Sequence, residues 1–555
     1  MSIQKPLTVV ERIKTASRGL RGTLSESLSD ELTGAIREDD QTLIKFHGMY
    51  QQDDRDRREE RTAKKLEWLY SFMIRLRLPG GYMTAEQWKA LHHITGEHTT
   101  GVIKITTRQT VQLHGILKSH LRPTISAFNT VALDSIAACG DVNRNVTCSA
   151  HPSQSKVHAE VFAYADKIST MALPKTRAYY EIWLNDEPLR EKPVEEDPLY
   201  QDRYLPRKFK IGIAIPPDND VDVMSNDIGL IAIVENDQLL GFNIAVGGGL
   251  GTTHGNASTY PRLATVIGFV SGEEKILKAV YEVITIQRDY GDRTDRKMSR
   301  LKYTLDRMGI DVFKKELEHR IGFRLEDERP FAFSQRRDHF GWQRNHEGLW
   351  YYTAFVETGR VTDDNKMKLK TALYEIAESG KGAFRFTCNQ NIVVADVADA
   401  DKAFVDEILQ RYGVLAFTEN SGAMRRSAIA CVAFNTCPLA LAEAQRYLPS
   451  LISKIEPLLA KHGLDKDDIS IRMTGCPNGC GRPTMAEIGL IGTAYGKYNL
   501  HLGGDRLGLR LNQKYKSDLD EAAILEILDE ALDAYVKEKA DDESFGDYIH
   551  RRGLS

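Results

Sequence analysis

Four of the seven cysteines carry the strongest chemical signal in this chain of 555 residues. They follow the pattern Cys-x5-Cys, then 38 residues, then Cys-x3-Cys, and are Cys431, Cys437, Cys476 and Cys480. Grouped thiolates in a chain without a disulfide framework are best interpreted as metal ligands. Cys-Pro at 437–438 and at 476–477 resembles cluster-binding loops. The quartet therefore predicts a metal centre, and the spacing favours a [4Fe-4S] cluster.

A structural zinc site is the alternative for the same quartet. Zinc ligands usually pair two to four residues apart, whereas five residues separate Cys431 from Cys437. The loop 474–481 has three glycines, which let backbone amides approach cluster sulfurs or a cofactor plane closely. Four thiolates complete a cubane cluster, and one could also bridge outward to a second metal. Spacing alone does not show which one.

Basic side chains gather in the half of the chain that lacks the quartet. They are Arg75, Arg77, Arg108, Arg144, Lys208 and Lys210. Two of the pairs are spaced two positions apart, which on a strand aims both cations at one side. Such a face suits a small oxyanion or the carboxylates of a tetrapyrrole. A solvated charged surface is the alternative interpretation.

The remaining motifs are weak. The run 247–251 followed by His254 fits neither Gly-x-Gly-x-x-Gly opening a helix nor a Walker loop. No flavin or nicotinamide fingerprint occurs elsewhere, so we expect the electrons to arrive from another protein. The three isolated cysteines are interpreted as small buried hydrophobes; they are Cys139, Cys148 and Cys388.

Two internal repeats indicate the elements that position these residues. Residues 103–112 align with 384–393, and each copy follows a segment that favours a helix. Residues 227–232 recur at 487–492, each followed by a glycine-rich tail. The order along the chain is A-B-A′-B′, so a ligand at the pseudo-twofold would meet different residues from each half. Only B′ carries the quartet.

The repeats predict an α+β fold of mixed-sheet modules rather than one doubly wound sheet. We expect an N-terminal arm at 1–65, partly flexible because residues 51–61 are highly charged. The modules that follow are A at 66–135, B at 136–330, A′ at 331–405 and B′ at 406–555. The apolar spacing over 519–539 predicts an amphipathic helix that packs on the last module.

Composition narrows the function classes. Hydrophobic residues make up 42% and charged residues 27%, as in globular proteins, and the net charge of −4 gives no basic excess for nucleic acid. No apolar run approaches the roughly 18 residues of a membrane span, and the N-terminus lacks the apolar region of a secretory signal. We therefore expect no nucleic-acid partner, no membrane partner and a cytoplasmic location.

Together, these motifs resemble the sirohaem sulfite/nitrite reductase superfamily. The resemblance rests on the cysteine spacing, the loop at 474–480, Thr-Thr-Arg-Gln-Thr at 106–110, Asn-Arg-Asn-Val at 143–146 and Leu-Pro-Arg-Lys-Phe-Lys at 205–210. It covers nearly the whole chain. It is closest to the haemoprotein (beta) subunits of assimilatory NADPH-dependent sulfite reductases, because the segment 43–55 also matches.

The resemblance implies a three-domain sulfite/nitrite reductase-like fold and a sirohaem that shares a thiolate with the [4Fe-4S] cluster. Cys480 is the matching residue, both cluster ligand and axial haem ligand. The anion-binding set that catalyses sulfite reduction would be Arg75, Arg144, Lys208 and Lys210. Sirohaem contacts would be Arg77, Arg108 and Gln112.

The resemblance also implies the reaction and the partners. Sulfite would be reduced by six electrons to sulfide, in sulfate assimilation and cysteine biosynthesis. NADPH would supply the electrons through a separate flavoprotein (alpha) subunit carrying FAD and FMN, with the N-terminal arm as a candidate docking element.

Three alternatives stay open. A sirohaem nitrite reductase and a ferredoxin-fed sulfite reductase would use the same cofactors. A zinc- or cluster-stabilised binding protein without catalysis would carry the basic pairs on a solvated surface.

Overall fold

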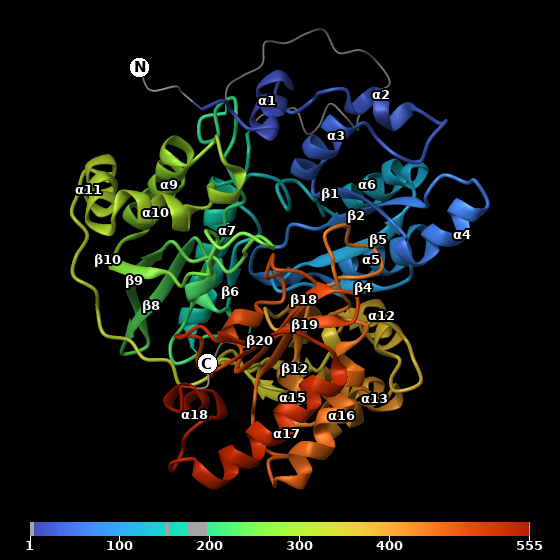
Figure 1. Ribbon diagram of the computed structural model, residues 1–555, viewed down its shortest axis with the longest axis vertical. Coiled ribbons are helices and arrows are strands. Elements are labelled where there is room, and N and C mark those ends of the chain that lie inside the picture. Colours follow the sequence, from blue (N-terminus) through green and yellow to red (C-terminus); the bar gives the residue numbers. More distant parts are fainter. Residues whose placement is uncertain (1–4, 151–154, 176–196, 554–555) are drawn as a thin grey trace.

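The computed structural model describes residues 5–150, 155–175 and 197–553, so the first four residues of the predicted arm lie outside it. The described chain forms four five-stranded sheets flanked by helices (Figure 1). Parallel and antiparallel pairing occur in one sheet, which confirms the predicted α+β class with mixed sheets. None of the described helices is long and apolar enough to cross a membrane.

The first sheet belongs to module A. Its strands, in spatial order, are β1 (Met49–Asp53), β2 (Tyr70–Arg75), β5 (Val111–Ile116), β4 (Ile103–Ile105) and β13 (Arg360–Val361). Its helices are α5 (Ala85–His98) and α6 (Leu121–Thr130). Helix α5 begins in a capping box, in which the Thr84 hydroxyl accepts from the Gln87 amide and the Gln87 side chain accepts from the Thr84 amide.

The sheet of module A′ repeats this order. Its strands are β11 (Gly341–Arg344), β12 (Trp350–Ala354), β15 (Ile392–Val397), β14 (Ala383–Phe386) and β3 (Tyr82–Met83). Its helices are α12 (Leu369–Ser379), α13 (Lys402–Arg411) and α14 (Val414–Asn420), so this module continues past the predicted boundary at residue 405. The last strand of each sheet is donated by the other copy, because β13 pairs with β4 and β3 pairs with β14. The two A-type modules are therefore interlocked.

Module B contains one mixed sheet and helices around it. Its strands are β10 (Thr265–Val270), β9 (Gln238–Val246), β8 (Ile228–Glu235), β7 (Ile211–Ala214) and β6 (Thr147–Cys148). Its helices are α7 (Lys156–Met171), α9 (Glu273–Tyr290), α10 (Leu301–Met308) and α11 (Ile310–Ile321). Figure 1 shows them in green and yellow-green to the left of module A.

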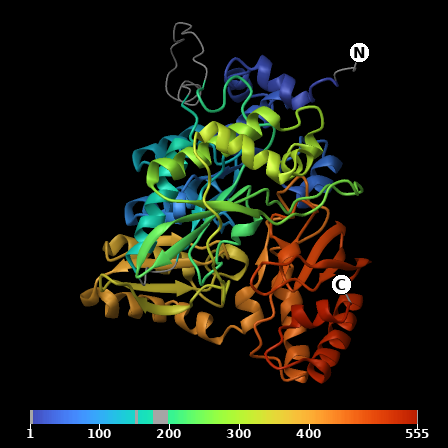
Figure 2. The ribbon, with the colours of Figure 1, turned by 90° about the vertical axis from the view of Figure 1, so that its left-hand side faces the viewer.

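The sheet of module B′ has the same strand order as the sheet of module B, with β16 to β20 in the places of β6 to β10. Its strands are β20 (Gln513–Leu519), β19 (Lys497–Leu502), β18 (Ile488–Ala494), β17 (Ile471–Thr474) and β16 (Ile429–Ala430). Its helices are α15 (Ala423–Ser427), α16 (Leu448–Lys461), α17 (Glu521–Glu538) and α18 (Phe545–Arg551). Helix α17 buries its apolar stripe against this module, as the spacing predicts. Figure 2 shows B′ in red beside the gold strands of A′.

The predicted boundary at residue 65 is wrong, because the chain before it is part of module A and not a separate arm. Strand β1 pairs with β2 along its whole length. Four short helices lie around it: α1 (Val9–Ala16), α2 (Leu24–Ser29), α3 (Glu38–Leu43) and α4 (Arg58–Ala63). The charges of 51–61 do not prevent folding, because the stretch continues from β1 into two short helical segments and its charges pair locally, as Arg58 does with Asp53 at 2.6 Å.

Candidate cluster and oxyanion site

The four cysteines lie on two loops at one end of the B′ sheet. Cys431 follows β16 directly, Cys437 lies six positions further on, and Cys476 and Cys480 lie between β17 and the next short helix. Gly475 makes this arrangement possible, because a Cβ at this position would lie 2.5 Å from the Ala442 carbonyl oxygen. The parallel pairing of β16 with β17 brings the two loops together.

Hydrogen-bond donors already point at two of the sulfurs. The Gly475 amide and the Thr474 hydroxyl lie 3.3 and 3.4 Å from Sγ of Cys431. The Asn478 side-chain amide lies 3.4 Å from Sγ of Cys476. Donors of this kind stabilise thiolates and tune a cluster that they hold.

The four thiols of the quartet influence one another's charge. Burial, with a further contribution from the other quartet sulfurs, raises the pKa of Cys437 and of Cys476 to about 12, so the thiols are close enough to repel as thiolates. Such repulsion is relieved by a bound cation. Yet among the described residues no three His, Cys, Asp or Glu side chains converge tightly enough to hold one metal ion.

Arg55 of the N-terminal segment clamps the first cysteine loop. Its guanidinium donates to the carbonyls of Cys437 and Ala440 at 3.1 and 2.8 Å and lies 4.3 Å from the Phe434 ring centre. The Asn435 side-chain amide donates to Asp54 at 2.8 Å. The highly charged stretch thus fixes the position of the cluster loop.

Cys480 differs from the other three cysteines because it alone is exposed. Its thiol faces the cations of the other half, since its charge acts on the pKa of Arg75, Lys208 and Lys210. The Thr107 hydroxyl, on the turn between β4 and β5, donates to the Cys480 carbonyl at 3.1 Å. Residues far apart in the sequence therefore meet around this one sulfur.

The two lysines are held in an environment that disfavours their charge. Burial, together with the guanidinium groups of Arg207, Arg300 and Arg144, lowers the pKa of Lys208 to about 7, although Cys480 opposes them. Burial, Lys208 and nearby arginines place the pKa of Lys210 well below its usual range. No carboxylate is among the main influences on either lysine, so a bound anion would relieve both.

The other predicted anion ligands are held by neutral groups. Arg144 is buried and donates to the Gly140 carbonyl at 2.9 Å from Nε. Arg75 lies 3.3 Å from Sγ of Cys139, and the Gln112 amide oxygen, when it faces Arg75, accepts from its Nε at 3.1 Å. Within the described part of the chain neither guanidinium forms an ion pair with a carboxylate, which is the feature expected of a site that receives a negatively charged group.

The predicted cofactor contacts divide into two kinds. Arg108 donates to the Asn226 side chain and to the Ile211 carbonyl at 2.5 and 2.8 Å, and its Nε has no partner among the described residues. Arg77, in contrast, pairs with Asp134 at 2.9 Å and donates to the Ser169 hydroxyl at 3.1 Å. Arg108 is near the converging cations, whereas Arg77 is engaged elsewhere.

Sequence reasoning missed the residues that support the lysines. Asp227 accepts from the Lys210 amide at 2.9 Å and pairs with Arg300 at 2.9 Å, both deeply buried. Asp227 begins the repeated segment 227–232, which could have drawn attention to it. Arg300 carried no signal, because it lies 73 positions away from its partner.

The glycine-rich run of module B also contacts the site. The Thr252 amide donates to the Pro477 carbonyl at 2.9 Å, and a Cβ on Gly251 would lie 2.9 Å from the Asn478 carbonyl oxygen. The buried Lys302 ammonium donates to the carbonyls of residues 249 and 251 at 3.1 and 3.0 Å. This run therefore packs against the second cysteine loop.

Comparison with known proteins accounts for both kinds of module. Residues 163–325 and 421–555 match the family model described as the nitrite and sulphite reductase 4Fe-4S domain. Residues 69–131 and 343–412 match the nitrite/sulfite reductase ferredoxin-like half domain. The paired matches reproduce the duplicated order of the chain. The family description supports an iron–sulfur cluster.

Individual relatives are similar over their whole length. A sulfite reductase (NADPH) hemoprotein beta-component of Leptospira biflexa is 62% identical, covering 100% of both chains. One from Staphylococcus haemolyticus is 51% identical, covering 100% of this chain and 96% of that protein. The solved structure of the NirA protein of Mycobacterium tuberculosis is 25% identical with a TM-score of 0.80, covering 99% of this chain and 97% of that one.

These matches support a haem and an iron–sulfur cluster, and they confirm the predicted duplicated sulfite/nitrite reductase fold. The chain therefore belongs to the nitrite and sulphite reductase family, alongside the haemoprotein beta-components of NADPH sulfite reductase, and it is an enzyme of that family.

Proposed function

We propose that this protein reduces sulfite to sulfide by six electrons, at a sirohaem coupled to a [4Fe-4S] cluster. The observation that carries the proposal is the exposed Cys480 thiol, which faces a set of buried cations while three further cysteines lie behind it. A thiolate in this position would be available as a ligand to both a cluster and a haem iron. Cys431, Cys437 and Cys476 would hold the cluster alone.

The cofactor pair, when bound, supplies the electron transfer, and the chain's own residues bind the substrate and deliver protons. Arg75 and Arg144 are fixed positive charges that hold the oxyanion. Lys208 and Lys210 add charge and carry protons that they can give up, because burial lowers their pKa. Each oxygen that leaves sulfite as water needs two protons, so donors must stand beside the bound anion.

Arg108, Gln112 and Arg77 are proposed as sirohaem contacts. Arg108 and Gln112 fit this role, because they lie with the converging cations and Gln112 orients Arg75. Arg77 fits it less directly, because its guanidinium is paired with Asp134. A bound tetrapyrrole carboxylate would have to compete with Asp134 for Arg77.

The electrons are proposed to come from NADPH through a separate flavoprotein subunit that carries FAD and FMN. The names of the relatives support this, because they describe a beta-component of an NADPH enzyme. The N-terminal segment remains the candidate docking element. Such an enzyme would serve sulfate assimilation and cysteine biosynthesis in the cytoplasm, where reducing conditions keep the ligand thiols free.

Turnover assays test the proposal. The purified holoprotein should form sulfide from sulfite with a reduced viologen dye as donor, and NADPH should replace the dye only when the flavoprotein is added. A higher kcat/KM for nitrite than for sulfite would overturn the substrate assignment. Efficient reduction with ferredoxin but not with the flavoprotein would overturn the donor assignment.

A further inference from the structure

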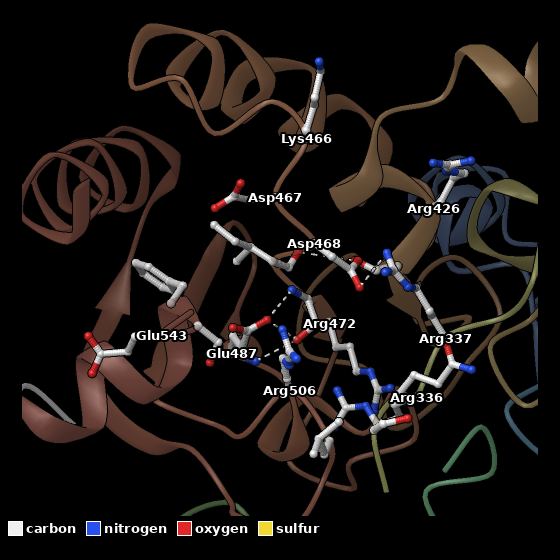
Figure 3. Close-up of a pocket in the computed structure, with 18 of the residues that line it drawn as sticks. Arg336, Arg337, Arg426, Lys466, Asp467, Asp468, Arg472, Glu487, Arg506 and Glu543 are labelled. Atoms are coloured by element: carbon white, nitrogen blue, oxygen red, sulfur yellow. Dashed lines mark hydrogen bonds and ion pairs between the residues drawn. The ribbon is translucent and has the colours of Figure 1, made fainter. Parts of the chain in front are cut away.

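A polar cavity of about 750 Å³ lies away from the cysteine loops, between modules A′ and B′. Its walls come from the linker that precedes β11, the loop before β17, and the C-terminal segment. In the close-up, Arg472 lies between Glu487 and Arg336, and Arg506 approaches from below (Figure 3). Neither the cysteines nor the proposed sulfite ligands line this cavity.

The pseudo-twofold relation explains where this cavity lies. Ile211 pairs in parallel register with Ile228, and 260 positions further on Ile471 pairs with Ile488 in the same way. The segments 211–227 and 471–487 therefore correspond residue for residue without a gap. Asp227, which supports Lys210, corresponds to Glu487.

The same offset relates the proposed oxyanion site to the cavity. Lys208 corresponds to Asp468 and Lys210 to Ser470. The pairing of β6 with β7 and of β16 with β17 makes Arg426 the counterpart of Arg144. The counterparts Arg426, Asp468 and Ser470 all line the cavity, together with Glu487. The cavity is thus the second copy of the oxyanion site, with different side chains.

The counterpart of the cysteine loop is covered by the chain itself. Asp220 stands at the position that corresponds to Cys480. The linker lies over this loop, because the Ser334 amide donates to the Pro217 carbonyl and the Asn219 amide donates to the Gln335 carbonyl, both at 2.8 Å.

Three arginines at or beside the cavity share a single carboxylate. Asp222 is the shared partner of three arginines, at 2.6 Å from Arg472, 3.0 Å from Arg482 and 3.5 Å from Arg336. One carboxylate therefore serves three guanidinium groups, two of which line the cavity. Arg472 is only 2% exposed, and its Nε has no partner among the described residues. A buried donor of this kind requires an acceptor.

Six acids line the cavity, and most of them are engaged with other groups or held partly neutral. Asp467 pairs with Lys539 at 3.9 Å, Glu543 pairs with Arg551 at 2.7 Å, and Asp338 accepts from the Thr387 hydroxyl and the Asn389 side-chain amide.

Burial raises the pKa of Glu487 to about 7, so its carboxyl is partly neutral at neutral pH. Burial also raises the pKa of Asp468, which pairs with Arg337 at 3.0 Å. In the described part of the chain, no ion pair neutralises Arg426 or Arg506.

We propose that this cavity binds a small ligand that carries a phosphate or sulfate group, with Arg426, Arg472 and Arg506 as its cationic contacts. Guanidinium groups match tetrahedral oxyanions because their forked donors form paired, charge-assisted hydrogen bonds. A bound dianion would compensate the excess charge around Asp222 and give the buried Arg472 Nε an acceptor. The proposal depends on the fold and not on the reaction at Cys480.

Calorimetric titration of the holoprotein tests this site, with inorganic phosphate, sulfate and adenosine 5′-monophosphate as separate probes. The haem absorption band, recorded in parallel, reports any anion that binds at the catalytic side. We expect binding heat that the haem band does not follow. Equal affinity for the three probes identifies a free oxyanion as the ligand, and preference for the nucleotide identifies an organic phosphate.

The double variant Arg426→Gln and Arg506→Gln provides the decisive comparison. Both side chains reach solvent, so the variant should fold, and it should bind phosphate at least tenfold more weakly, a change of about 1.4 kcal/mol. Arg324→Gln, an exposed arginine of module B, is the matched control and should bind as the unmodified protein does. The proposal is overturned if all heat follows the haem band, or if the double variant binds phosphate with unchanged affinity.

Discussion

The Thr107 hydroxyl donates a hydrogen bond to the backbone carbonyl of Cys480 at 3.1 Å, although the two residues are 373 positions apart. Thr107 lies on the turn that also carries Arg108, and Cys480 ends the second cysteine loop. This contact joins the half that supplies the cations to the half that supplies the thiolates. The relative position of substrate and cofactors therefore depends on contacts between modules.

Removing this hydrogen bond should weaken the junction. Thr107→Val keeps the shape of the side chain but leaves the Cys480 carbonyl without this donor, so the free energy of unfolding should fall by about 0.5–1.5 kcal/mol. Chemical denaturation of the two proteins measures the difference. Thr107→Ser keeps the hydroxyl and should be nearly unchanged. Equal loss in both variants would show that the methyl group, not the hydrogen bond, matters.

Arg300 should act as a positioning residue for the lysines. It holds Asp227, which in turn accepts from the Lys210 amide. Arg300→Lys keeps the charge but loses the two-pronged contact, so kcat/KM for sulfite should fall about tenfold or more while the iron content stays constant. Steady-state kinetics with a chemical donor and iron analysis check both statements. The matched control is Arg288→Lys, because Arg288 lies outside the site. Equal losses of kcat/KM in the two variants would contradict the role of Arg300.

Lys208 should give the reaction a pH dependence near neutrality. Burial lowers its pKa to about 7, so the ammonium form that binds an anion is lost as the pH rises through about 7, and kcat/KM for sulfite should fall there. Lys208→Arg carries a fixed charge, so its kcat/KM should not fall at that pH, while kcat drops because arginine does not release a proton. A fall at the same pH in both proteins would assign the titration to another group.

Lys208 should also affect the stability of the fold. Its contribution to the free energy of unfolding should rise with pH, whereas kcat/KM should fall. Its pKa is about 7 in the folded chain and about 10.4 when unfolded. Between these values the unfolded chain binds a proton that the folded chain does not, so the lysine's contribution to stability rises with pH. Comparing the pH dependence of unfolding for Lys208→Arg and the unmodified protein isolates this contribution. A steeper rise in the variant would contradict it.

Glu487 should make the fold less stable at alkaline pH. Burial raises its pKa to about 7, above the value of about 4.3 expected in the unfolded chain. Its stabilising contribution is complete below about pH 4.3 and is lost as the pH rises through about 7, which amounts to about 2 kcal/mol between pH 5.5 and 7.5. Glu487→Gln cannot titrate, so its unfolding free energy should decline less over this range. The same decline of the unfolding free energy with pH in the two proteins would contradict this role of Glu487.

The sequence predicted the duplication well, because it is encoded in local patterns. The aligned segments 103–112 and 384–393 become β4–β5 and β14–β15, and 227–232 and 487–492 fall on β8 and β18. Alternating apolar residues and repeated glycines are preserved in both copies, since each copy must form the same sheet. The α+β class follows from the same patterns.

What the sequence did not reveal depends on partners that are distant along the chain. The strands β13 and β3 have two residues each, too few for a periodic signal, and are defined only by the sheet they join. Arg77 meets Asp134, 57 positions away, because the segment that follows α6 lies beside the end of β2. The cysteine spacing predicted a metal centre but gave the four cysteines equal roles. The family resemblance set Cys480 apart from the other three, and the structure then showed that it is the exposed one.

The absorption spectrum of the Cys480→Ser variant tests the central claim most directly. The unmodified protein should show a tetrapyrrole Soret band and a band in the red region, and the variant should lose or strongly shift both because the thiolate to the haem iron is gone. Cys148→Ser, which changes a buried cysteine outside the quartet, should keep the original spectrum. An unaltered spectrum in Cys480→Ser, or no tetrapyrrole bands in the unmodified protein, would contradict the account.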